Sequence, residues 1–146
     1  YDYVRVYVPE GSELLSVDGF VNPEGMVIQD GVIGYDKTTG EVGLGNTKVY
    51  VENGKTVFAN WMVTDPWSAS TAKYTYKLPF KINDNYSLYY QKQSGRREID
   101  YLFKFVPGGS RKVTRINKDI VNNQGEYFWR DNGKKDLSIL FDLAKN

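Results

Sequence analysis

The fold class is decided by residues 47–63, which read TKVYVENGKTVFANWMV. Two runs rich in β-branched and aromatic residues flank Asn53-Gly54, the dipeptide that best supplies the two positive φ angles of a two-residue type I′ turn. Glu52 and Lys55 then stand opposite each other with unlike charges, which favours the pairing. The stretch predicts a tight β-hairpin.

The same alternation of apolar and polar residues continues on both sides of this hairpin. Residues 3–8 alternate ahead of the turn Pro9-Glu10-Gly11, and residues 14–17 form a short second run. Residues 22–46 are rich in glycine and are expected to form a long loop with small hairpins. Further strands, at the spacing of roughly 8 to 12 residues that is typical of a sandwich or barrel, are expected over 72–78, 86–93, 98–106, 113–120, 126–130 and 137–143.

No window of the sequence shows a convincing helical period. We therefore predict an all-β protein, an antiparallel β-sandwich of the immunoglobulin-like type. Residues 131–135 are typical of a turn, so the last two strands are expected to form a C-terminal hairpin. One domain is expected over 1–146, with a main body over 1–107 and C-terminal strands, 108–146, docked on it. Tyr1 lies inside a predicted strand, so we expect the sequence to be a piece of a longer chain.

The composition excludes much of the usual catalytic chemistry. The chain of 146 residues contains neither cysteine nor histidine, which rules out disulfides, Cys/His zinc sites and nucleophiles activated by histidine. The loop acids Asp30, Asp36 and Glu41 show no catalytic or metal-binding spacing. We expect no catalytic residue, no metal site, no cofactor and no enzymatic activity.

Charge is balanced in total, at +1, but segregated along the chain. Residues 1–36 contain seven acidic residues and one basic residue, whereas residues 92–118 contain eight basic and two acidic ones. The basic segment favours an anionic polymer as a ligand, held by Arg96, Arg97, Arg111, Lys112 and Arg115. The alternative, which is the commoner one for charge runs, is that the two segments pair within the fold or are solvated faces.

Aromatic residues suggest a second kind of binding site, since flat exposed rings stack on sugars. Trp67 is the strongest candidate because Asp65-Pro66-Trp67-Ser68 is typical of a turn between strands, and Tyr89 and Tyr90 are further candidates. Trp61 alternates with Val57 and Ala59 and is expected in the core.

An intramolecular Lys–Asn amide would need neither cysteine nor histidine. Lys48, Lys55 and Lys73 are candidate donors, and Asn60 and Asn117 are candidate acceptors. No motif indicates this bond, and ordinary exposed lysines are the expected case.

Four stretches, 3–15, 54–61, 74–80 and 86–95, together resemble the C-terminal β-rich region of a family of large, uncharacterised bacterial envelope proteins. The similarity covers roughly residues 1–107 in order, and Ser94 stands where the family pattern has proline. Such proteins typically begin with a membrane-spanning helix and are expected to lie outside the cell. The family has no established catalytic residues, so the resemblance implies location only.

We therefore expect a non-enzymatic module of the extracellular cell surface, with a structural or interaction role in the bacterial envelope. The alternatives are a carbohydrate-binding module that uses exposed Trp and Tyr, or a module that binds an anionic polymer through residues 92–118. The expected partner is an envelope glycan or another surface protein. We expect no nucleic acid and no membrane contact by this fragment, although the parent protein would be membrane-anchored.

Overall fold

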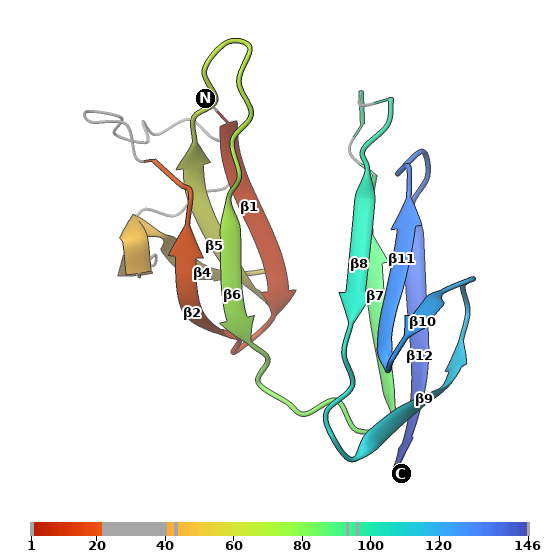
Figure 1. The fold of residues 1–146 in the computed structure, drawn as a ribbon. Coiled ribbons are helices and arrows are strands. Elements are labelled where there is room, and N and C mark those ends of the chain that lie inside the picture. Colours follow the sequence, from red (N-terminus) through yellow and green to blue (C-terminus); the bar gives the residue numbers. More distant parts are fainter. Residues whose placement is uncertain (1, 22–40, 43, 93, 96, 146) are drawn as a thin grey trace. The chain divides into compact units, whose positions relative to one another are not determined.

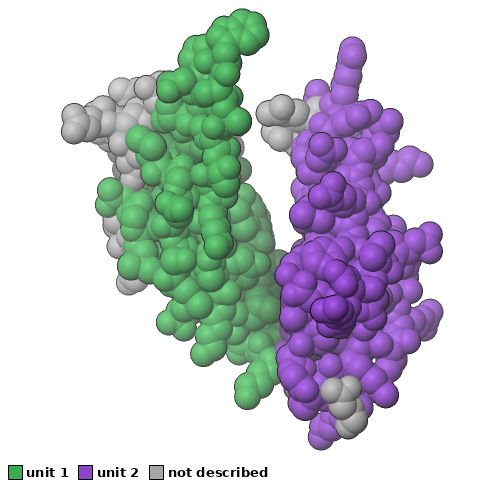
Figure 2. All heavy atoms as spheres, viewed as in Figure 1, with its two compact units in different colours: residues 1–81 green, residues 82–146 purple. Residues whose placement is uncertain are grey.

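A computed structural model describes residues 2–21, 41–42, 44–92, 94–95 and 97–145 (Figure 1). The described chain is mainly β-strand and contains one short 3-10 turn, η1 (Leu44–Asn46), so the all-β prediction is confirmed. It forms two compact units, unit 1 over residues 1–81 and unit 2 over residues 82–146 (Figure 2). Most of the glycine-rich loop expected over 22–46 lies outside the described residues.

Unit 1 contains a four-stranded antiparallel sheet with the order β1-β5-β4-β3. Its strands are β1 (Asp2–Pro9), β3 (Glu41–Val42), β4 (Lys48–Glu52) and β5 (Lys55–Met62). The β4–β5 hairpin confirms the prediction, because Asn53 and Gly54 adopt φ angles of 50° and 66° and Glu52 pairs with Lys55. The two turn residues therefore set the register of the sheet.

A second sheet of unit 1, formed by β2 (Glu13–Asp18) and β6 (Lys73–Lys77), covers one face of the first. The ring of Phe58 on β5 lies 6.0 Å from that of Tyr74 and 5.8 Å from that of Tyr76, both on β6. The hydroxyl group of Tyr74 donates a hydrogen bond to Oδ1 of Asn60 at 2.7 Å. These contacts join the two sheets of the unit.

The five residues 56–60 of β5 are all buried, so this strand is covered on both faces. Val57 and Ala59 lie in the core as alternation predicts, and Trp61 is half-buried. The intervening residues Thr56, Phe58 and Asn60 are buried as well, because the β2–β6 sheet packs on their side. An alternating pattern of apolar and polar residues predicts burial of every second residue only, so it predicted only half of the buried residues of β5.

Unit 2 contains two three-stranded antiparallel sheets, with the orders β10-β11-β8 and β7-β12-β9. The strands are β7 (Asn85–Tyr90), β8 (Tyr101–Phe105), β9 (Arg111–Ile116), β10 (Val121–Asn123), β11 (Glu126–Asp131) and β12 (Leu137–Lys145). The predicted strands thus exist near their expected positions, and β10 is an addition.

The core of unit 2 is aromatic and is centred on Phe141. Alternate residues of β12, namely Leu137, Ile139, Phe141 and Leu143, are buried. The ring of Phe141 lies 4.5 Å from that of Phe105 on β8, and it also contacts rings on β11 and β7. Because β8 and β11 belong to one sheet and β12 to the other, the two sheets of the unit face each other through this cluster.

The predicted C-terminal hairpin is wrong, because its two strands belong to different sheets. β11 pairs with β8 and β10, whereas β12 pairs with β7 and β9. The connection between β11 and β12 therefore passes from one sheet to the other, which lets Tyr127 and Phe141 approach the core from opposite sides. The hairpin of this region is β10–β11 instead, with positive φ angles at Gln124 and Gly125.

The chain divides between Lys81 and Ile82, ahead of the expected division after Pro107. The reason is the strand pairing: β7 and β8 precede Pro107, yet they pair with β12 and β11, which follow it. That both units form the single domain expected from the sequence stays a prediction.

Candidate functional site

Trp67 lies in the connection between β5 and β6, which extends beyond the ends of these strands (Figure 1). The amide and the hydroxyl group of Ser68 both donate to the carbonyl oxygen of Asp65, at 3.1 and 2.8 Å. Pro66 occupies the second position of this turn, and Trp67 occupies the third with a φ of 63°. This is the pattern of a type II turn, whose third position normally requires glycine or asparagine.

The side chain of Trp67 is fully exposed, as its place in a turn predicts. Its backbone conformation costs an L-residue roughly 1–2 kcal/mol relative to glycine, and its ring adds nothing to the core. The turn therefore holds a large apolar ring in water on a strained backbone. Such a ring is suited to stacking on a flat ligand or to entering a pocket of a partner.

The predicted pair Tyr89 and Tyr90 does not form one surface, because neighbouring residues of a strand point to opposite faces. Tyr90 points inward, and its ring lies 4.4 Å from that of Tyr101. Tyr89 points outward with 64% of its surface exposed. A platform for sugars could use Tyr89 but not both rings.

Asp136 holds the ring of Tyr89 in place at the surface of unit 2. The Tyr89 hydroxyl group donates to one carboxylate oxygen of Asp136, and the backbone amide of Lys92 donates to the other, both at 2.8 Å. These two hydrogen bonds, the Lys92 amide first, hold the pKa of the Asp136 carboxyl below its usual range. The bond to Asp136 also raises the pKa of Tyr89.

The basic residues predicted to bind an anionic polymer are divided by the fold. Arg111 is engaged within unit 2, since its guanidinium group donates to the carbonyl oxygen of Asn83 and lies 3.6 Å from a carboxylate oxygen of Asp84. Lys112 and Arg115 are exposed on β9, and Arg97 is exposed in the connection between β7 and β8. Arg96 lies outside the described residues.

Two further lysines of this segment also have intramolecular partners. The ammonium group of Lys104 lies 2.8 Å from a carboxylate oxygen of Glu126. That of Lys118 lies 5.5 Å from the centre of the Trp129 ring. Since β8 and β9 belong to different sheets, the described cations of the segment 92–118 do not form one continuous patch on a single sheet.

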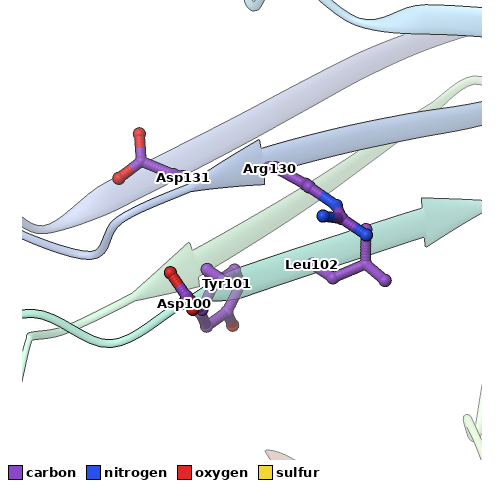
Figure 3. A pocket seen from close by; sticks show the side chains of 5 residues that line it. All are labelled: Asp100, Tyr101, Leu102, Arg130 and Asp131. Atoms are coloured by element: carbon purple, nitrogen blue, oxygen red, sulfur yellow. The ribbon is translucent and has the colours of Figure 1, made fainter.

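A hollow of about 270 Å³ lies on unit 2, where β8 and β11 run side by side, and it is lined by Asp100, Tyr101, Leu102, Arg130 and Asp131. Figure 3 shows the guanidinium group of Arg130 beside Leu102 and the carboxylate of Asp100 next to Tyr101. Within the described residues Arg130 forms no ion pair. Asp100 and Arg130 are both exposed and carry opposite charges, so the hollow is a polar surface around the exposed side chain of Leu102.

This hollow was not predicted from the sequence. Arg130 lies outside the basic segment, and its neighbour Leu102 is distant along the chain. The two residues meet only because β11 pairs with β8 in the register that places Arg130 opposite Leu102. Burial, and to a smaller extent the charge interaction with the neighbouring Tyr90, raise the pKa of Tyr101.

The two candidate acceptors of a Lys–Asn amide already have hydrogen-bonding partners. The Asn60 side chain donates to the carbonyl oxygen of Gly45 and accepts from Tyr74. The Asn117 side chain bonds to the backbone of β12 at Ser138 and Leu140. The expectation of ordinary lysines without such a covalent bond stays a prediction.

Among the described residues there is no group of three or more acidic side chains placed to hold a metal ion. Nor does this part of the chain contain a helix long and apolar enough to cross a membrane. Comparisons with protein-family models, with curated proteins and with solved structures gave no match.

Proposed function

We propose that this chain is a non-enzymatic binding module of the bacterial cell surface, with Trp67 as its anchor. The observation that carries the proposal is the fully exposed indole at a φ of 63° in the turn 65–68. Glycine at this position would relieve the backbone strain, and a polar residue would avoid exposing an apolar ring. Contact with a partner explains why a tryptophan is here.

The isolated position of the Trp67 ring favours a partner that supplies a pocket or a flat apolar face. Trp67 has no exposed aromatic neighbour within its turn, and Asp65 is the single charge of residues 63–72. Tryptophan is among the residues that contribute most binding energy at protein interfaces, where loss of the side chain costs about 2 kcal/mol or more. The resemblance to envelope proteins supports a surface protein or an envelope glycan as the partner, and an extracellular location.

The sheet architecture agrees with such a module. The two facing sheets of unit 2, joined by the cluster around Phe141, support the β-sandwich part of the predicted fold. Its immunoglobulin-like form is part of the proposal.

The test is cosedimentation of the purified chain with isolated bacterial cell envelopes, together with a glycan array. We expect Trp67→Ala to weaken binding by about tenfold or more. Val51→Ala is the matched control, because Val51 is an apolar residue of unit 1 that is 61% exposed, and it should bind as wild type does. Binding that is indifferent to Trp67→Ala, or no binding by the wild type in either format, would refute the proposal.

Carbohydrate binding is the second candidate, favoured by the outward ring of Tyr89 that Asp136 fixes in place. On the glycan array it predicts a loss of signal for Tyr89→Ala. Binding of an anionic polymer through Lys112, Arg115 and their neighbours predicts instead an affinity that falls steeply with salt. Affinity that does not change between low and physiological salt would exclude this third function.

A further inference from the structure

β8 is an outer strand of its sheet, paired with β11 on one side only among the described strands. An outer strand exposes unpaired backbone N–H and C=O groups, and proteins usually protect such strands with proline, bulges, repeated charges or short length. β9 carries three cations and β10 has three residues. β8 has neither proline nor an irregular register, and its Leu102 is 58% exposed.

The sequence of β8 together with Asp100, the residue directly before it, is self-complementary about Leu102. Asp100 and Lys104 lie two residues to either side of it, and Tyr101 and Phe103 lie one residue to either side. In an antiparallel pair, two copies of this strand related by a two-fold axis at Leu102 place Asp100 opposite the partner's Lys104. The same register places Tyr101 opposite the partner's Phe103 and joins the two Leu102 side chains.

The side chains needed for this contact are accessible. Leu102 and Lys104 alternate along β8 and are both exposed, as is Asp100, which directly precedes the strand. Figure 3 shows the side chains of Asp100 and Leu102 in the hollow beside Arg130. The ion pair of Lys104 with Glu126 is itself exposed and therefore weak, and an ammonium group has three donors, so it can bind a second carboxylate.

We propose that two copies of this chain associate through antiparallel pairing of their β8 strands about Leu102. The two β10-β11-β8 sheets then continue across the two-fold axis, and each Asp100 forms an ion pair with the partner's Lys104. Such an isologous contact closes on itself and gives a dimer rather than a fibre. It goes beyond the proposed function, since it uses unit 2 and does not depend on Trp67.

Cross-linking tests the register directly, because the chain has no cysteine of its own. At the two-fold axis the Cα atoms of position 102 would lie about 4.5–5.5 Å apart, within the range of about 4.4–6.8 Å that a disulfide spans. We expect Leu102→Cys to form a covalent dimer on mild oxidation. Val121→Cys is the control, at a position 68% exposed on the opposite outer strand of the same sheet, and it should remain monomeric.

Charge reversal tests the ion pairs by sedimentation velocity over a range of protein concentrations. Asp100→Lys brings each new lysine opposite the partner's Lys104, and because the pair occurs twice we expect a dimer dissociation constant about tenfold higher. Lys104→Asp should weaken the dimer similarly, and the double variant should recover most of the wild-type affinity. Circular dichroism confirms that each variant is folded.

A wild-type chain that stays monomeric at millimolar concentration would overturn the proposal. So would a dimer that is insensitive to Asp100→Lys, or equal cross-linking of the Leu102→Cys and Val121→Cys variants. Trp67→Ala should leave the dimer unchanged, so failure of this contact is distinguishable from failure of the anchor in unit 1.

Discussion

Replacing Trp67 by glycine should raise the stability of unit 1 while abolishing the proposed binding. The turn keeps its hydrogen bonds from Ser68 to Asp65, because neither involves the side chain of Trp67. The indole is fully exposed, so its removal costs no buried surface. What changes is the backbone, which at a φ of 63° is strained for any residue that has a Cβ atom.

The magnitude follows from two opposing effects. Relief of the left-handed conformation stabilises the folded state by roughly 1–2 kcal/mol, whereas the greater freedom of glycine in the unfolded chain costs about 0.4–1 kcal/mol. Trp67→Ala retains the Cβ atom and lacks the ring, so it is the appropriate reference. We expect Trp67→Gly to be more stable than Trp67→Ala by about 0.5–1 kcal/mol.

Urea titration measures this difference by the fluorescence of Trp61, which lies in unit 1. Both variants are made in a Trp129→Phe background, so that no tryptophan of unit 2 contributes to the signal. Both should bind envelopes equally poorly. A Trp67→Gly variant that is no more stable than Trp67→Ala would show that the turn is not strained, and strain would then no longer support Trp67 as a binding residue.

Two further predictions concern unit 2. Phe141→Ala should lower the free energy of unfolding of unit 2 by about 3–5 kcal/mol, because the ring is fully buried at the centre of the aromatic cluster. Urea titration followed by Trp129 fluorescence measures this loss. The control is Leu140→Ala, at an exposed neighbouring position, and a loss for Phe141→Ala no larger than that of the control would contradict the prediction. Asp136→Asn should destabilise unit 2 at neutral pH, since hydrogen bonds from Lys92 and Tyr89 hold the pKa of the folded-state carboxyl below its ordinary value of 3.8. The stabilisation by these hydrogen bonds is present at pH values above the ordinary carboxyl pKa and is lost as the pH falls through the lowered pKa of the folded state. The urea midpoints of the variant and the wild type should therefore converge in acid. A gap between the midpoints that does not change with pH would refute the role given to Asp136.

The parts of the fold that depend on neighbouring residues were predictable from the sequence. Asn53-Gly54 sets a turn between strands that follow each other directly, so both the hairpin and its register could be predicted. The strand of residues 137–143 was also recognisable, because its buried positions alternate strictly. In both cases the signal lies within a few residues.

The sheet partners were not predictable, because every half-buried strand shows the same alternation whichever strand it pairs with. Nothing local indicates that residues 85–90 pair with β12 rather than with β8, and the wrong C-terminal hairpin has the same origin. The exposed position of Trp67 followed from its turn, whereas its positive φ did not, since bulky residues rarely adopt it. The sequence did not indicate Arg130 as a residue of the hollow, because its neighbour Leu102 comes from a strand distant along the chain.

The central place of β12 has a consequence for how the protein is made. Among the described strands, β7 and β9 pair only with β12, which is the last of the three to leave the ribosome. The sheet β7-β12-β9 therefore cannot form while residues 137–145 are still being synthesised. Unit 1, whose strands all precede Lys81, can complete its sheets earlier. Synthesis and folding would thus proceed in two stages, and the sheet β7-β12-β9 of unit 2 would be completed only when its final strand has been made.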